Sequence, residues 1–184
     1  MKNLKLKLKS IAIIAFIASV SNFTYAQHNH GNMNMKKSNH DMMAHNDNMV
    51  KLNDKNLTKA YMHYTMIKDA LVEANSEKAQ KASKMLVKIL KKYDKAQEAE
   101  KVASQMASKS NITEQRIIFA KLTTALEPLL NDNVVEGEIY KTFCPMANDG
   151  EGSYWFSNSS NIVNPYMGKP MASCGSVKET FKSM

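Results

Sequence analysis

The chain has 184 residues, enough for one domain with terminal tails, and its formal net charge is +8. Four lysines lie in a predicted export signal, so the remaining chain carries 21 basic against 17 acidic residues, a net charge of +4. This small excess argues against a nucleic-acid-binding protein, and we expect no nucleic acid partner.

Residues 1–26 have the pattern of a secretory signal peptide. Four lysines precede a ten-residue apolar run at 11–20, and Thr24-Tyr25-Ala26 offers small residues at the cleavage positions. The apolar run is much shorter than the ~20 residues that a membrane span requires. We therefore expect a mature protein that begins at Gln27, has no membrane span and is exported to the periplasm.

Residues 27–53 are predicted to form a disordered tail, because they show neither helical nor strand periodicity and no apolar cluster. Imidazole suits Cu(II) and thioether suits Cu(I), which indicates an auxiliary metal-binding segment. The alternative interpretation is a polar linker. The candidate ligands of the tail are His28, His30, Met33, Met35, His40, Met42, Met43, His45 and Met49.

Between residues 53 and 131 Pro128 is the only Gly or Pro, a composition typical of helices. Apolar residues spaced by three and four predict helices around 57–71, 79–93 and 96–106. A last helix follows Asn111, which with Glu114 is typical of a capped helix start. The break near 93–94 is weakly marked, so one helix over 77–108 is an alternative. We expect a mainly α domain over 54–184, an up-down bundle of three to four helices.

Most chemistry-bearing side chains of the predicted helices have an ordinary packing interpretation. His63 is predicted to be a surface or partly buried side chain with no role as a ligand or base. The four helical methionines are expected to fill the core; they are Met62, Met66, Met85 and Met106.

Residues 138–184 are predicted to form a small C-terminal β-hairpin and loop element. Segments 138–143 and 154–156 are rich in β-branched and aromatic residues, and a Gly-containing turn at 149–152 separates them. Two later X-Pro pairs, ending in Pro165 and Pro170, require extended or turn backbone. We expect this geometry to return the end of the element towards its start.

Both cysteines of the chain lie in this element, and each has a methionine close by. Cys144 and Met146 flank a proline, and Met171 precedes Cys174 by three residues. Two thiols and two thioethers form a soft ligand set, which predicts a Cu(I) site. Because an exported protein can oxidise its thiols, a Cys144–Cys174 disulfide is the alternative. It would stabilise the fold by about 3 kcal/mol in the chain-entropy model.

Enzymatic activity is not expected from this sequence. It contains no Cys-x-x-Cys, phosphate loop, dinucleotide fingerprint or zinc-protease helix. The favoured function is copper binding or delivery by an exported protein. The alternative is a disulfide-stapled helical module that binds a protein partner and has no metal site of its own.

Over residues 57–181 the chain resembles an uncharacterised family of Gram-negative periplasmic domains. Members of that family occur alone or fused to CusB-type adaptors of copper and silver efflux pumps. The resemblance implies heavy-metal handling, with a CusB-type efflux component as partner. Upstream the resemblance includes Lys68-Asp69-Ala70-Leu71, Gln115-Arg116, Phe119 and Leu122. The C-terminal signature consists of Tyr140, Cys144-Pro145-Met146-Ala147, Gly152, Tyr154-Trp155, Ser157, Ile162, Asn164-Pro165-Tyr166, Gly168, Met171 and Cys174-Gly175.

Overall fold

A computed structural model describes residues 49–183. The predicted signal peptide and the tail ligands from His28 to His45 lie outside these residues. The element order is β1 (Lys51–Leu52), α1 (Lys55–Val72), α2 (Ser76–Leu90), η1 (Asp94–Ala96), α3 (Gln97–Ala107), α4 (Ile112–Leu130), β2 (Val134–Glu136), β3 (Glu138–Cys144), β4 (Ser153–Ser157), η2 (Lys169–Met171) and β5 (Ser176–Lys182).

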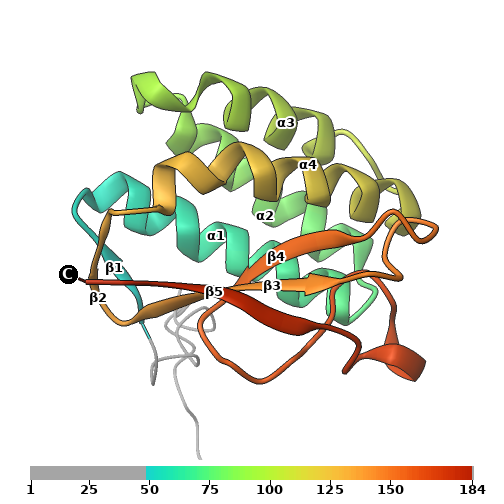
Figure 1. Ribbon diagram of the computed structural model, residues 1–184. Coiled ribbons are helices and arrows are strands. Elements are labelled where there is room, and N and C mark those ends of the chain that lie inside the picture. Colours follow the sequence, from blue (N-terminus) through green and yellow to red (C-terminus); the bar gives the residue numbers. More distant parts are fainter. Residues whose placement is uncertain (1–48, 184) are drawn as a thin grey trace, which may run out of the picture. The chain divides into compact units, whose positions relative to one another are not determined.

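The predicted helical bundle with a small β element is confirmed. The four α-helices lie on one side of the domain, and the strands β3, β4 and β5 lie on the other (Figure 1). Each helix packs against the next in sequence, and α4 also packs against β4. The sheet therefore covers the α1–α4 side of the bundle.

The helix boundaries follow the sequence signals. Side-chain oxygens of Asp54, Asn75 and Asn111 accept hydrogen bonds from backbone N–H groups at the starts of α1, α2 and α4. Such caps satisfy donors that lack a partner within the helix. The break predicted near residue 93 is confirmed by the short η1 helix. Pro128 lies within the last turn of α4, which continues to Leu130.

The predicted hairpin is present, and it is part of a larger antiparallel sheet than the sequence indicates. Strand β3 pairs with β4 over Tyr140–Cys144, and its other edge pairs with β5. A second, two-stranded sheet joins β1 to β2. Strand β1 overlaps the end of the predicted tail, and Val50 and Leu52 are buried. The folded domain thus begins before Asp54.

A continuous aromatic layer fills the space between the helices and the sheet. Tyr64 of α1 stacks on Phe119 of α4, with ring centroids 4.9 Å apart, and contacts Phe156 of β4 at 5.7 Å. Phe119 contacts Tyr166, which in turn meets Trp155 edge-on. Such pairs add to the free energy gained by burying large apolar surfaces.

The helical methionines divide into buried and exposed members. Met106 is fully buried and Met66 packs against the core, as predicted. Met62 and Met85 are 43% and 40% exposed, so the prediction that they fill the core is wrong.

His63 is more deeply buried than the sequence suggests, with 6% of its surface exposed, and its Nδ1 atom has no hydrogen-bond partner among the described residues. Burial lowers the pKa of His63 from its ordinary value. The unfolded chain therefore binds a proton at a higher pH than the folded protein.

We expect the free energy of unfolding to fall as the pH drops below the ordinary histidine pKa of about 6.5. Above that pH the imidazole is neutral in both states, so its effect disappears. Urea unfolding at neutral and at mildly acidic pH measures this fall in the free energy of unfolding. The fall should be smaller for His63→Leu than for the unsubstituted protein. Equal losses would contradict a neutral, buried His63.

Candidate metal and thiol site

The two cysteines lie at the adjacent ends of two paired strands, β3 and β5. Cys144 is the last residue of β3 and is fully buried, and Cys174 lies two residues before β5 and is half-buried. Because β5 pairs with β3 in the register Phe143↔Ser176, the sheet brings the two positions to the same end.

The sheet register places Cys144 and Cys174 near each other, and the Cys144 thiol affects the pKa of the Cys174 thiol. A hydrogen bond with the Cys144 thiol, followed by burial, raises the pKa of the Cys174 thiol, while a hydrogen bond from the Met146 backbone opposes the rise. Both cysteines are free thiols. The pair could therefore hold a soft ion between two sulfurs, or it could oxidise to a disulfide.

The loop that carries Cys174 is fixed by one buried amide side chain. The Nδ2 group of Asn164 donates to the Cys174 carbonyl at 2.7 Å, and its Oδ1 accepts from the Tyr166 N–H at 2.7 Å. The backbone N–H of Asn164 donates to the Ala172 carbonyl at 2.8 Å. Asn164 thus joins the two arms of the loop, and its replacement would free Cys174 to move.

The same loop is attached to the helices and to β4. Arg116 of α4 donates from Nε to the Pro165 carbonyl at 2.9 Å and from Nη2 to the Leu71 carbonyl at 3.1 Å. The Tyr166 hydroxyl donates to the Tyr154 carbonyl at 2.6 Å. Arg116 thus connects the loop at Pro165 to the C-terminal end of α1, and Tyr166 connects the same loop to β4.

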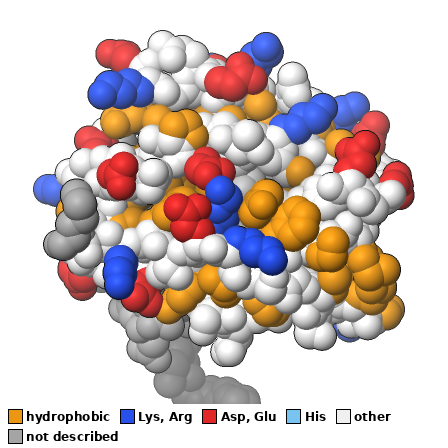
Figure 2. All heavy atoms as spheres, viewed as in Figure 1, with side chains coloured by type: hydrophobic (Ala, Val, Ile, Leu, Met, Phe, Trp, Pro, Cys, Tyr) orange, Lys and Arg blue, Asp and Glu red, His pale blue; other side chains and the backbone are white. Residues whose placement is uncertain are grey.

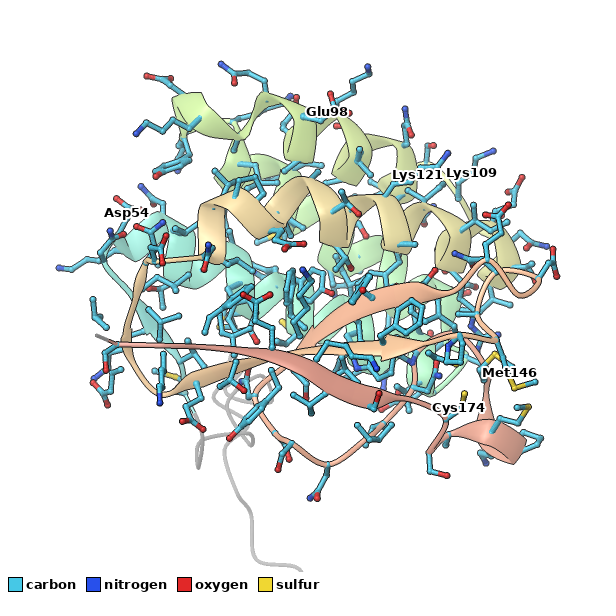
Figure 3. The ribbon with its side chains drawn as sticks, viewed as in Figure 1. Asp54, Glu98, Lys109, Lys121, Met146 and Cys174 are labelled. Atoms are coloured by element: carbon cyan, nitrogen blue, oxygen red, sulfur yellow. The ribbon has the colours of Figure 1, made fainter. Side chains whose placement is uncertain are left out.

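The two methionines predicted as ligands have different surroundings. Met146 follows Pro145 in the β3–β4 turn and is 53% exposed. Figure 3 shows Met146 and Cys174 at the same end of the domain. Met171 is half-buried in η2, and its carbonyl accepts a hydrogen bond from the Cys174 N–H at 3.1 Å. The structure therefore brings the two cysteines to one end of the sheet and places Met146 and Met171 on the adjoining turns.

A further sulfur side chain, not foreseen from the sequence, lies at this end. Met167 is half-buried and lines the same surface groove as Met146. It directly follows the Asn164-Pro165-Tyr166 motif, so its position depends on the hydrogen bonds of that motif. In the sequence, the one indication of a role for Met167 is that it directly follows this motif.

Within residues 49–183, no three His, Cys, Asp or Glu side chains gather into a group that could hold a metal ion. None of the helices in this part of the chain is long and apolar enough to cross a membrane.

Comparison with known proteins gives one match. Residues 60–136 match the family model described as "Protein of unknown function (DUF3347)". The matched range begins in α1 and ends with β2, so it contains Arg116 but neither cysteine. No curated protein and no solved structure matches the chain. The match supports an uncharacterised domain of unknown function over these residues.

Proposed function

We propose that the protein is exported to the periplasm, where it binds Cu(I) through the thiols of Cys144 and Cys174 and stores or delivers copper in heavy-metal resistance. The strand pairing that brings Cys144 and Cys174 to one end of the sheet carries the proposal, and the Cys144 thiol raises the pKa of the Cys174 thiol. Thiolates are strong ligands for soft monovalent ions, and thioethers on neighbouring turns favour Cu(I) over harder divalent ions.

The attachment of the loop supports a binding site. A pair of ligands that is already positioned loses little conformational entropy when the ion binds. Asn164 fixes the backbone of Cys174, and β3 fixes Cys144. The ion would replace the proton on each thiol, and the buried side of the pair, next to Trp155, would limit access of water.

The composition of the chain outside the described residues is consistent with this function. The segment 27–49 contains four histidines and five methionines, which are ligands for both oxidation states of copper. The resemblance to domains fused to CusB-type adaptors supports an efflux component as the recipient of the ion.

A structural disulfide is the second candidate, because the same strand pairing favours it. The protein would then be a stapled helical module that binds a protein partner such as an efflux adaptor, with no metal site of its own. Thiol alkylation of protein isolated from the periplasm without reductant separates the candidates: unreacted cysteines that become reactive after reduction indicate a disulfide.

Cu(I) titration of the reduced mature protein against a competing chelator tests the metal site. We expect Cys174→Ser and Cys144→Ser to lower the affinity of the tight site by about 100-fold or more, since each removes a thiolate ligand. Ser173→Ala is the matched control, because it changes an exposed neighbour of Cys174. All variants keep the same tail, so binding by the tail is common to them.

Cys174→Ser is the more informative variant, because Cys144 is fully buried and its substitution also affects packing. Thermal unfolding of each variant separates loss of the site from loss of the fold. Wild-type affinity equal to that of the double Cys→Ser variant would reject the metal site.

A further inference from the structure

A groove lies between α4 and the loops that carry Met146 and Met167, and Pro145, the residue after Cys144, lines it. Its volume is about 470 Å³, and its walls include Ile117, Met146 and Met167. It adjoins a second hollow, which shares Ile117 and reaches Tyr154. In Figure 2 hydrophobic side chains gather at the lower right, over the end of the domain where Figure 1 places the loops around η2.

We propose that Met146 and Met167 form an outer site for a soft monovalent cation, Cu(I) or Ag(I), from which the ion passes to the thiol pair. The transfer to the thiols rests on the proposed function. The outer site itself rests on the two thioethers that line one groove. Thioethers bind soft monovalent ions in preference to hard divalent ones.

Both methionines are attached to well-fixed backbone. Met167 follows Tyr166, whose N–H and hydroxyl are both hydrogen-bonded, at 2.7 and 2.6 Å. The turn that carries Met146 is closed by the Gly152 N–H, which donates to the Ala147 carbonyl at 2.9 Å. Both thioethers are thus carried on ordered backbone, which lowers the conformational entropy lost when an ion binds.

The groove is lined by one cationic and one anionic side chain, so these two formal charges cancel. Arg116 also lines it, and its guanidinium is held by the Pro165 and Leu71 carbonyls. Asp149 lines the same groove and supplies a carboxylate that offsets this charge. Two neutral thioethers then determine which cation binds.

Met146 connects the outer site to the thiols. Its side chain lines the groove, and it lies two residues after Cys144, the last residue of β3. In the transfer the bonds from the ion to the two thioether sulfurs break, and bonds to the sulfurs of Cys144 and Cys174 form. Each thiol releases its proton to solvent, and the ion keeps its oxidation state. The exchange is favourable because a thiolate is a stronger ligand than a neutral thioether.

The outer site is tested with Ag(I) in mature Cys174→Ser protein, in which the thiol pair is broken. Methyl NMR of ¹³C-labelled methionine should show the Met146 and Met167 signals shifting together as Ag(I) is added. The signals of Met62 and Met85, exposed methionines of the helices, serve as internal controls and should not move with them. Unshifted Met146 and Met167 signals would overturn the outer site, whatever the thiols bind.

The transfer is tested by the rate at which reduced wild-type protein takes Cu(I) from a chelator. We expect the double variant Met146→Leu/Met167→Leu to take up Cu(I) about tenfold more slowly, an effect comparable to that of altering groups around a metal site. Its equilibrium affinity should change much less. Met62→Leu/Met85→Leu, which removes the same number of exposed thioethers, should retain the wild-type rate.

An unchanged uptake rate in the groove variant would overturn the transfer while leaving the thiol site intact. Failure of the proposed function has a different signature, namely equal Cu(I) affinity in wild-type and double Cys→Ser proteins. In that case the Ag(I) experiment still decides whether the methionine pair binds a soft ion.

Discussion

Replacement of Gly175 by alanine is expected to destabilise the protein by roughly 2–5 kcal/mol, combining backbone strain with overpacking. A Cβ atom at this position would lie 2.7 Å from Cη2 of Trp155 and 3.0 Å from the Phe143 carbonyl oxygen. The φ angle of Gly175 is +140°, which side-chain-bearing residues rarely adopt. Neither neighbour can yield easily, since Trp155 is buried and Phe143 lies within β3.

Gly150→Ala is the matched control for this substitution. Gly150 also has a positive φ, +90°, but nothing lies within 4 Å of the Cβ that alanine would add. Its replacement therefore introduces backbone strain alone, about 1–3 kcal/mol. Denaturant unfolding of both variants measures the difference, which reports the clash with Trp155 and Phe143. Equal destabilisation would show that the close approach is relieved without cost.

The Gly175 substitution also bears on the thiol site, because Gly175 directly follows Cys174. If the tight packing of Gly175 against Trp155 positions the thiol, any Gly175→Ala protein that remains folded should bind Cu(I) more weakly than Gly150→Ala. The glycine after Cys174 then has a physical reason, because a residue without Cβ lets the chain approach the indole ring of Trp155.

The helices were predictable because their signals are local. Capping residues such as Asn111 and apolar residues at intervals of three and four identify them without tertiary information. Strand β5 was not predictable in this way, since Phe181 is the one buried residue among Ser176–Lys182. With a single buried side chain the strand shows no alternation, and pairing with β3 alone specifies it.

The candidate site was predictable only in part. The prolines and the two cysteines in one element predict that Cys174 returns towards Cys144, and the pairing of β5 with β3 brings the two positions to the same end of the sheet. The groove shared by Met146 and Met167 depends on Arg116, which is distant in sequence and holds the Pro165 carbonyl. No local pattern encodes such a contact. The sequence therefore indicates Met171 as a candidate ligand, from its position three residues before Cys174, and gives no comparable indication for Met167.

Tyr64 links the helical layer to the sheet through its hydroxyl group. The Phe156 N–H of β4 donates to it at 3.0 Å, and Thr123 of α4 lies 2.8 Å away. Because the Thr123 hydroxyl donates to the Phe119 carbonyl, the Tyr64 hydroxyl is the donor to Thr123. One buried hydroxyl thus connects α1, α4 and β4, and burial raises its pKa.

Tyr64→Phe is expected to lower the free energy of unfolding by about 1–3 kcal/mol, because it leaves the buried Phe156 N–H without its acceptor. The aromatic ring is retained, so the stacking on Phe119 is preserved. Tyr64→Ala should cost about 3–5 kcal/mol, since it also removes the ring from the core. Urea unfolding monitored by circular dichroism measures both effects.

Tyr61→Phe provides the matched control within the same helix. The Tyr61 hydroxyl is also buried, but it has no hydrogen-bond partner among residues 49–183. Removing it abolishes a desolvated polar group without breaking a bond, so stability should be unchanged or slightly increased. A loss for Tyr61→Phe as large as that for Tyr64→Phe would contradict the role assigned to the Tyr64 hydrogen bonds.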